Sequence, residues 1–210
     1  MNKTDLEKYF LLKRQNISEI NFWFKNNALR NNKTIYCGIK CKYCCNSYLI
    51  GSNMEIELIF YFLNNNNFLM DNFTLNLKKW KKKNAAAEKI IRDINELIPV
   101  VAGQQTNGKF LSEIEYEKTL LKYYELTNLY CSKNIMCPFL YKNECSIYQI
   151  RPYVCVNLVS YTKPEFCASN TGLREICRSK IPPVIIPVDG SVKFVPIISA
   201  CVEKQEQLSK

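Results

Sequence analysis

The residues with the clearest chemistry in this chain are cysteines, and two groups of them are closely spaced. The first group is the stretch CGIKCKYCC, which contains Cys37, Cys41, Cys44 and Cys45. The second group contains Cys137, Cys145 and Cys155. Four thiols this close cannot pair as ordinary disulfides, because a bridge needs separated and correctly directed Cα positions. Loops of two or three residues do let successive sulfurs reach one metal centre, so the spacing predicts metal binding.

The absence of histidine limits the kind of metal site. The chain has 11 cysteines and no histidine, so a soft-metal site consists of thiolates alone, or of thiolates with carboxylate, water or substrate. Zinc and iron–sulfur clusters both accept four thiolates. The adjacent pair Cys44 and Cys45 favours an iron–sulfur cluster, with [4Fe-4S] the expected type, because adjacent thiols often cannot bend back to the same small ion. Zinc is the alternative.

The number of metal centres stays open. Seven cysteines fit one four-sulfur site with spare thiols, or two such sites if Cys167, Cys177 or Cys201 supplies an eighth ligand. The structural interpretation of Cys131, Cys167 and Cys201 is that they are small buried hydrophobic residues.

Together the two groups resemble the YkgJ-type cysteine-cluster family, which is described as zinc- or iron-chelating. Members carry a CxxxCxxCC-like cluster, followed by Cys-Pro-Phe-Leu, Cys-x-Ile-Tyr and Arg-Pro-x-x-Cys elements. This chain matches those elements at residues 137–140, 145–148 and 151–155, and Glu55 stands where the family tends to have an acidic residue that opens a helix. The resemblance covers about residues 37–178. It departs at Val156, where the family often has arginine.

The resemblance implies metal binding rather than a particular reaction. The same broad group includes relatives similar to flagellin lysine-N-methylase, which implies an iron–sulfur enzyme that uses S-adenosylmethionine in a methyltransferase reaction on a protein side chain. Redox chemistry is a further possibility, and so is a zinc-stabilised structural or binding module. No catalytic residue is assigned from the sequence.

Arg151 is the predicted cofactor-binding residue. Its guanidinium is suited to neutralise the charge of a cluster or to hold a carboxylate or phosphate. The alternative is an ordinary ion pair at the surface or in the core. We expect Phe139 and Tyr148 to pack over the metal and exclude water, and Glu55 to cap a helix.

Two other function classes fit parts of the sequence. Cys37-x3-Cys41-x2-Cys44 is the spacing of radical S-adenosylmethionine enzymes, but the β/α repeats of that fold are not apparent, and none of the six glycines forms a GxGxxG loop. The net charge of +10 and the lysine run 78–83 around Trp80 fit a nucleic-acid surface. Only six of the 29 basic residues are arginine, so base recognition is disfavoured. A protein substrate is the partner that the resemblance to the lysine methylase relatives implies.

The elements that must position the cysteines are predicted to be mainly helical. Helices are expected over 6–29 with a break near Asn16, over 52–63, over 74–98 closed by Pro99, and over 112–130. Capping boxes at Ser52/Glu55 and Ser112/Glu115 open two of these helices. Core positions expected on the last helix are Leu120, Leu121, Tyr124 and Leu129.

Short extended pieces and a helical turn near residues 151–155 are expected after Cys131. The turn Asp189-Gly190-Ser191 predicts a hairpin of 184–188 with 192–197. The predicted fold class is mainly α with short β hairpins (α+β). We expect a single metal-stapled domain, 1–210, that carries its first cysteine cluster at 36–47 and its second at 137–155, because a shared site would join both halves of the chain.

The cellular compartment is predicted from the first residues and from the cysteines. Asp5 and Glu7 do not suit a signal peptide, and the longest apolar runs are too short to span a bilayer. We therefore expect a soluble, cytoplasmic protein that does not enter a membrane. In a reducing compartment, many cysteines indicate metal or redox chemistry rather than structural disulfides. The oligomeric state is not predicted.

Overall fold

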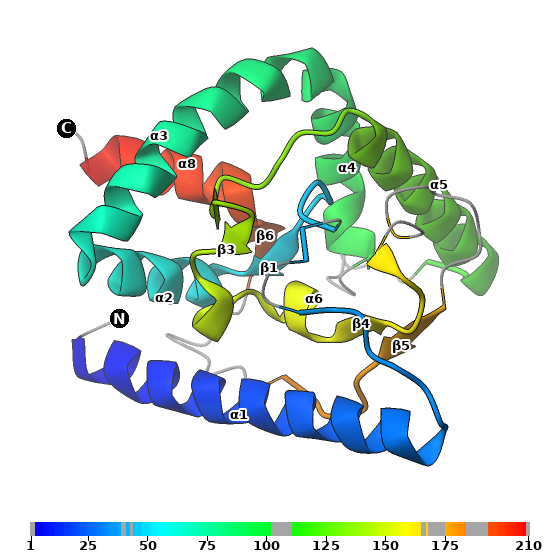
Figure 1. Cartoon of the computed structure of the whole chain (residues 1–210). Helices are drawn as coiled ribbons and strands as arrows, with labels where there is room; N and C mark the ends of the chain where they lie inside the picture. Colours follow the sequence, from blue (N-terminus) through cyan, green and yellow to red (C-terminus); the bar gives the residue numbers. More distant parts are fainter. Residues whose placement is uncertain are drawn as a thin grey trace.

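The computed structural model describes residues 3–38, 41–42, 44–101, 111–164, 167, 175–183 and 193–208. Within these ranges the chain is mainly helical with short antiparallel strand pairs, as predicted (Figure 1). The longer helices are α1 (Lys3–Arg30), α2 (Asn53–Asn64), α3 (Asn67–Asn84), α4 (Glu88–Val101), α5 (Glu113–Ser132) and α8 (Ile197–Leu208). Shorter helical pieces are the 3-10 turns η1 (Ala85–Ala87) and η2 (Tyr148–Ile150), and the helix α6 (Tyr153–Val156).

The strands are two or three residues long and form three antiparallel pairs in the described part of the chain. These pairs are β1 (Ile50–Ser52) with β6 (Phe194–Pro196), β2 (Leu140–Tyr141) with β3 (Glu144–Cys145), and β4 (Leu158–Ser160) with β5 (Ile176–Arg178). The turn and first strand of the hairpin expected at Asp189-Gly190-Ser191 lie outside the described residues. Its second strand overlaps β6, whose described partner is β1.

Both predicted capping boxes are confirmed. Ser52 Oγ accepts a hydrogen bond from Glu55 N at 3.3 Å, and Ser52 N donates to Glu55 Oε2 at 3.0 Å. Ser112 and Glu115 make the same two bonds, at 3.3 and 2.9 Å. Reciprocal side-chain bonds of this kind satisfy backbone donors that a helix start leaves without partners, which fixes where α2 and α5 begin.

Three predictions about helix boundaries are wrong. The expected helix over 74–98 is two helices, α3 and α4, which the turn η1 separates. The turn is part of the core, because Ala87 within it is 1% exposed and packs against the larger buried cluster. Pro99 does not close α4, which continues to Val101. The break expected near Asn16 is also absent, and α1 is continuous through this residue. The Asn16 side chain is buried and donates a hydrogen bond to Pro182 O.

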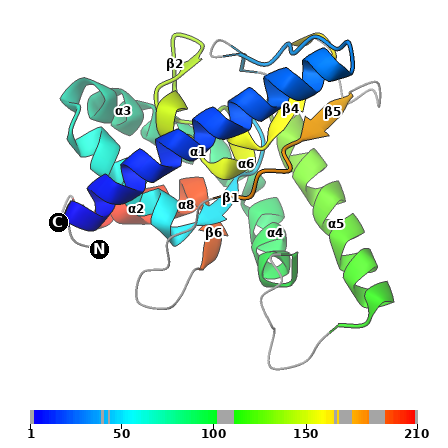
Figure 2. The ribbon, with the colours of Figure 1, turned by 90° about the horizontal axis from the view of Figure 1, so that it is seen from below.

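The predicted core face of α5 is wrong as well. Leu121, Tyr124 and Leu129 are 63%, 46% and 47% exposed, Leu120 is half-buried, and Tyr130 is the buried side chain among the described residues of this helix. Figure 2 gives the reason, because α5 lies at the edge of the molecule and packs along α4. A helix with one neighbour buries a narrow stripe and leaves its other apolar residues in solvent.

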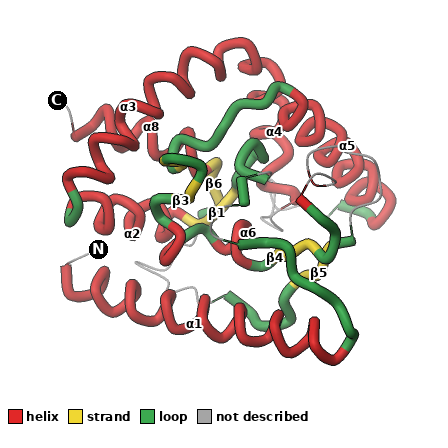
Figure 3. The backbone as a smooth tube through the Cα atoms, viewed as in Figure 1, coloured by secondary structure: helices red, strands yellow, loops and turns green. Residues whose placement is uncertain are grey.

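The buried side chains form two clusters. The larger cluster joins α2, α3 and α4 to segments from the second half of the chain, including Phe139, Ile147 and Ile197. The smaller cluster lies between α1 and the α6–β4 segment, where Ile17, Ile20 and Phe24 meet Tyr153, Val156 and Val159. The loops that carry the cysteines run through the middle of the surrounding helices, as Figure 3 shows. Core packing on both sides thereby brings the two groups of cysteines together.

Candidate functional site

Six of the seven predicted metal ligands line one cavity of about 60 Å³, which we call the inner cavity. They come from both cysteine groups: Cys41, Cys44, Cys45, Cys137, Cys145 and Cys155. The seventh, Cys37, lines an adjoining and more open cavity of about 270 Å³, the outer cavity. The two cavities share Cys41, Cys44 and Cys155. The fold therefore gathers all seven predicted ligands at one place.

A backbone hydrogen bond joins the two cysteine groups directly. Cys137 N donates to Cys45 O at 2.6 Å, which places the start of the second group beside the end of the first. A second bridge lies next to it, because the Asn46 side chain donates to Cys131 O at 3.0 Å. These contacts hold the first loop against the segment that follows α5.

The β2–β3 hairpin positions Cys145. Its two turn residues, Lys142 and Asn143, have φ angles of +48° and +67°. Two consecutive left-handed residues form the tight turn that matches the twist of paired strands, and asparagine adopts that conformation readily. The register places Cys145 opposite Leu140, at the wall of the inner cavity.

A buried ion pair positions the helix that carries Cys155. Glu55 Oε1 accepts a hydrogen bond from Tyr153 N, the first residue of α6, at 2.8 Å. The same oxygen binds Lys13 Nζ at 2.7 Å, while Oε2 caps α2 through Ser52 N. Lys13 and Glu55 are 0% and 3% exposed. One carboxylate therefore ties together α1, α2 and α6.

Sequence reasoning identified Glu55 as a helix cap but missed its lysine partner. The signal was present, because Lys13 stands on the stripe of α1 that contains the buried residues Tyr9, Ile17 and Ile20. A lysine in the middle of an apolar stripe indicates a buried charge that needs a partner.

The thiols around the cavities strongly affect one another's ionisation. Contact with Cys41 raises the pKa of Cys37, and contact with Cys44 raises that of Cys45, with burial adding to both shifts. Burial, together with neighbouring thiols, raises the pKa of Cys137 and Cys155. So many crowded thiols ionise together only when a cation is present to offset the charge.

The thiols do not surround a single point. Among the described residues, no three Cys, Asp or Glu side chains form a group already placed to hold a metal ion. Cysteine is nevertheless the ligand type that suits zinc and iron–sulfur clusters, and each of the 11 cysteines is present as a thiol rather than a disulfide. A metal centre therefore fits the donor set here but requires the cysteine side chains to move toward one another on binding.

Arg151 lies where the two cavities meet. It lines both, and its guanidinium carbon is 4.1 Å from the centre of the Tyr148 ring. Its charge lowers the pKa of Cys145 and Cys155 against the larger effect of burial. In the described part of the chain no carboxylate pairs with it, and its buried Nε has no hydrogen-bond partner. The ion-pair interpretation of Arg151 is therefore wrong for the described residues.

Phe139 and Tyr148, the two aromatic residues that we expect to pack over a metal, both line the inner cavity. Phe139 is 2% exposed, lines the cavity and stacks on Phe73, with ring centres 4.8 Å apart and planes 8° from parallel. Tyr148 lines both cavities and is half-buried. Leu49, Ile147 and Pro152 complete an apolar wall.

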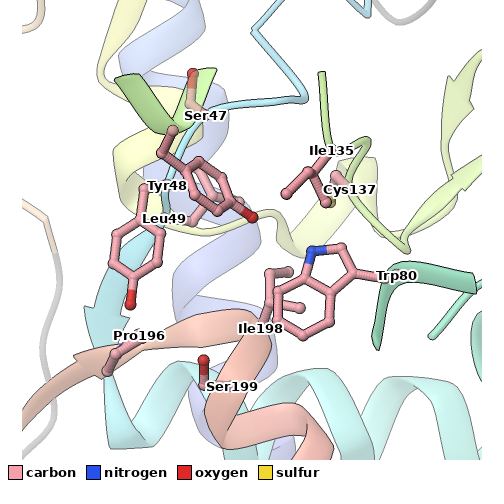
Figure 4. Close-up of a pocket in the computed structure, with 10 residues that line it drawn as sticks. Ser47, Tyr48, Leu49, Trp80, Ile135, Cys137, Pro196, Ile198 and Ser199 are labelled. Atoms are coloured by element: carbon pink, nitrogen blue, oxygen red, sulfur yellow. The ribbon is translucent and has the colours of Figure 1, made fainter. Parts of the chain in front are cut away.

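A third, much smaller cavity of about 10 Å³ lies behind Cys137. Figure 4 shows Trp80, Cys137 and Ile198 gathered around it. This volume is at the lower limit for one water molecule, so these side chains seal the back of the thiol site. Trp80 is 6% exposed, so its ring is not available to stack on a base, as a nucleic-acid surface over residues 78–83 would require.

The other four cysteines do not line either of the two cavities. Cys201 is fully buried in the larger core cluster, as expected of a small hydrophobic residue. Cys131 and Cys167 are half-buried, so that interpretation is wrong for them. Cys177 receives a hydrogen bond from Asn27 Nδ2 at 3.4 Å. Val156, at the position where the resemblance leads one to expect arginine, is 0% exposed in the smaller cluster.

The structure gives one finding on membranes. No helix within the described residues has the combination of length and apolar character needed to cross a bilayer. Comparison of the chain with protein-family models, with curated proteins and with solved structures finds no match.

Proposed function

We propose that the seven cysteines bind a metal centre through thiolate sulfur, an iron–sulfur cluster in the first place and zinc in the second. The observation that carries the proposal is that six thiols from two distant groups line one small cavity. Apolar side chains form much of the remaining wall and exclude water, as metal–thiolate sites require. A metal bound here would join the two halves of the chain, as in the metal-stapled single domain that we expect from the sequence.

The preference for the cluster over zinc rests on the adjacent pair Cys44 and Cys45, because adjacent thiols often cannot bend back to the same small ion. The seven thiols that line these adjoining cavities are more than the four that either centre takes. Four thiolates around a doubly charged centre leave a net charge of about −2. Among the described residues that line the inner cavity, Arg151 is the one charged side chain other than the thiols, and its positive charge can offset that excess.

The proposed role is redox chemistry or the modification of a protein side chain. The second role follows the resemblance to lysine methylase relatives and assigns S-adenosylmethionine as the co-substrate. Thiolate-bound clusters and reduced thiols belong in a reducing compartment, so the proposed location is the cytoplasm.

Anaerobic purification followed by an absorption spectrum and metal analysis tests this proposal. A brown protein that contains iron and sulfide in stoichiometric amounts identifies a cluster, whereas a colourless protein with stoichiometric zinc identifies the alternative. Protein that binds neither iron nor zinc overturns the proposal.

A pair of serine variants makes the test specific for the site. Cys44→Ser removes a thiol shared by both cavities and is expected to lower metal content and thermal stability together, because metal binding and folding are coupled. Cys131→Ser is the matched control, since Cys131 lines neither cavity. Equal metal content in the two variants contradicts the assignment of the ligands.

A further inference from the structure

We propose that the outer cavity binds a small organic anion beside the cysteine site, with Arg151 and Lys25 as its charged ligands. The inference rests on the proposed function in one respect, since four of the seven thiols also line this cavity. The class of ligand follows from the charge, the unsatisfied donor and the apolar wall of the cavity.

The charged side chains of the described lining have one sign. Among the described residues that line the outer cavity, Lys25 and Arg151 are charged, and none is an aspartate or a glutamate. Among the described residues no carboxylate pairs with these two cations, so they can bind an anionic ligand in addition to offsetting the charge of the proposed metal centre, and the surrounding low-dielectric wall strengthens that attraction.

The guanidinium has hydrogen-bonding capacity to spare. Arginine presents five N–H donors in a rigid fork, and Arg151 Nε is buried without a partner. A buried donor left without a partner is costly, so the site gains when a ligand supplies an acceptor. Carboxylates and phosphates match the fork with two parallel bonds. The Tyr148 ring lies against the guanidinium, 4.1 Å from its carbon, and restricts where the fork can lie.

The remaining lining describes the rest of the ligand. Asn21 of α1 adds a neutral donor and acceptor, and the apolar side chains Phe24, Ile35, Leu158 and Val159 also line the cavity. A volume of about 270 Å³ is small for a ligand site, which suits a compact metabolite with an anionic head and a short apolar tail. The thiols of Cys37, Cys41, Cys44 and Cys155 line the same space, so the ligand lies beside the proposed metal centre.

Ligand-observed NMR titration of the anaerobically purified, metal-loaded protein tests the proposal, because it detects millimolar affinities. The probes are isovalerate, its neutral amide and inorganic phosphate. We expect one of the two anions to bind, and the amide to bind at least about tenfold more weakly than isovalerate, because it lacks the charge. Tighter binding of isovalerate assigns a carboxylate head, and tighter binding of phosphate assigns a phosphate head. No binding of either anion overturns the inference.

Variants locate the site. Arg151→Met is expected to weaken the anion about ten- to hundredfold, and Lys25→Met to weaken it less, since Lys25 is exposed. Arg92→Met is the matched control, because the Arg92 side chain is 67% exposed and lines neither cavity. Unchanged affinity in both Arg151→Met and Lys25→Met overturns the inference.

Metal content measured on the same samples separates this inference from the proposed function. Arg151→Met protein that keeps its metal and loses the anion supports the ligand site. Loss of metal together with the anion in Arg151→Met, with Lys25→Met unchanged, assigns Arg151 to the metal centre and overturns the ligand site. Anion binding by protein that carries neither iron nor zinc supports the ligand site while the proposed metal centre fails.

Discussion

Replacing Glu55 by glutamine is the sharpest test of how this fold holds its cysteine site. The variant keeps an oxygen that can accept from Ser52 N or Tyr153 N, but it removes the negative charge 2.7 Å from Lys13 Nζ. Because Lys13 is fully buried, water cannot replace the lost carboxylate. Removing one member of a buried pair costs about 3–5 kcal/mol, since it leaves the other charge uncompensated.

The pKa of lysine gives an upper bound for this cost. An unpaired Lys13 can lose its proton, and neutralising an ordinary lysine at pH 7 costs about 4.6 kcal/mol. The expected loss is therefore about 3–4.6 kcal/mol, which lowers the thermal midpoint of a chain of this size by about 6–18 °C. Circular dichroism melts of the wild-type protein and the variant at equal metal content measure it.

The pH dependence of the loss identifies its cause. Burial already lowers the pKa of Lys13, and removal of the Glu55 charge lowers it further. The folded variant then carries a neutral lysine while the unfolded chain carries a charged one up to pH about 10.4. The unfolded state binds more protons, so the stability of the variant relative to wild type rises with pH, by up to about 1.4 kcal/mol per unit between pH 7 and 10. Taking the difference from wild type removes the contribution of the thiols.

Glu206→Gln is the matched control for this prediction. It breaks a second lysine–glutamate pair, in which the Lys81 side chain is 40% exposed and the Glu206 side chain is 59% exposed. Exposed pairs contribute at most about 1 kcal/mol. A loss in Glu55→Gln as small as that in the control, or a loss independent of pH, refutes the argument that Lys13 is a buried charge. Lys13→Met combined with Glu55→Gln is expected to recover part of the stability, because it removes both charges.

Three further predictions concern packing and thiol exposure. Gly51→Ala should cost about 1–3 kcal/mol, because a Cβ atom there would lie 2.6 Å from both Glu55 Oε2 and Ile197 Cδ1. Gly38→Ala, whose Cβ atom would meet no atom of the described residues within 4 Å, should change stability by less than about 0.5 kcal/mol in denaturant titrations. Leu121→Ser on the exposed face of α5 should change the free energy of unfolding by no more than about 0.5 kcal/mol, whereas Ile94→Ala in the core should lower it by about 2–5 kcal/mol. Equal losses in the two variants would mean that the α5 face is covered. Removal of the proposed metal with a chelator should speed alkylation of the exposed Cys44, whereas Cys201 should be protected in both states because it is fully buried. If mass spectrometry finds the same alkylation rate for Cys44 with and without metal, Cys44 is not a ligand.

The sequence predicted those parts of the fold that depend on local signals. The capping boxes at Ser52 and Ser112 are short-range hydrogen-bond patterns, and both appear as predicted. Which apolar face is buried depends on how many neighbours a helix has. The pattern of α5 could not show that it packs along α4 at the edge of the molecule, so Leu121 and Leu129 were wrongly placed in the core.

The candidate site likewise combines features that local sequence signals predict with features that depend on tertiary packing. Seven cysteines were identified from spacing and resemblance, and the fold brings all of them to two adjoining cavities. The Lys13–Glu55 pair was not identified, because it joins residues 42 positions apart whose proximity depends on the packing of α1 against α2. The position of Arg151 between the cavities, without a carboxylate partner among the described residues, likewise follows from tertiary packing.

The hydrogen bond between Cys137 N and Cys45 O has a consequence for how the protein is made. Ribosomes add about 5–20 residues per second, so the thiols at residues 37–45 exist for about 5–20 s before residues 137–145 are synthesised. During this interval the nascent chain carries four of the seven proposed ligands, and the other three have not yet been synthesised. Contacts between such distant segments also form slowly, because a long loop must close first. We expect metal that reaches the chain during translation to bind first at CGIKCKYCC, so that delivery during synthesis and reconstitution of the finished protein follow different routes.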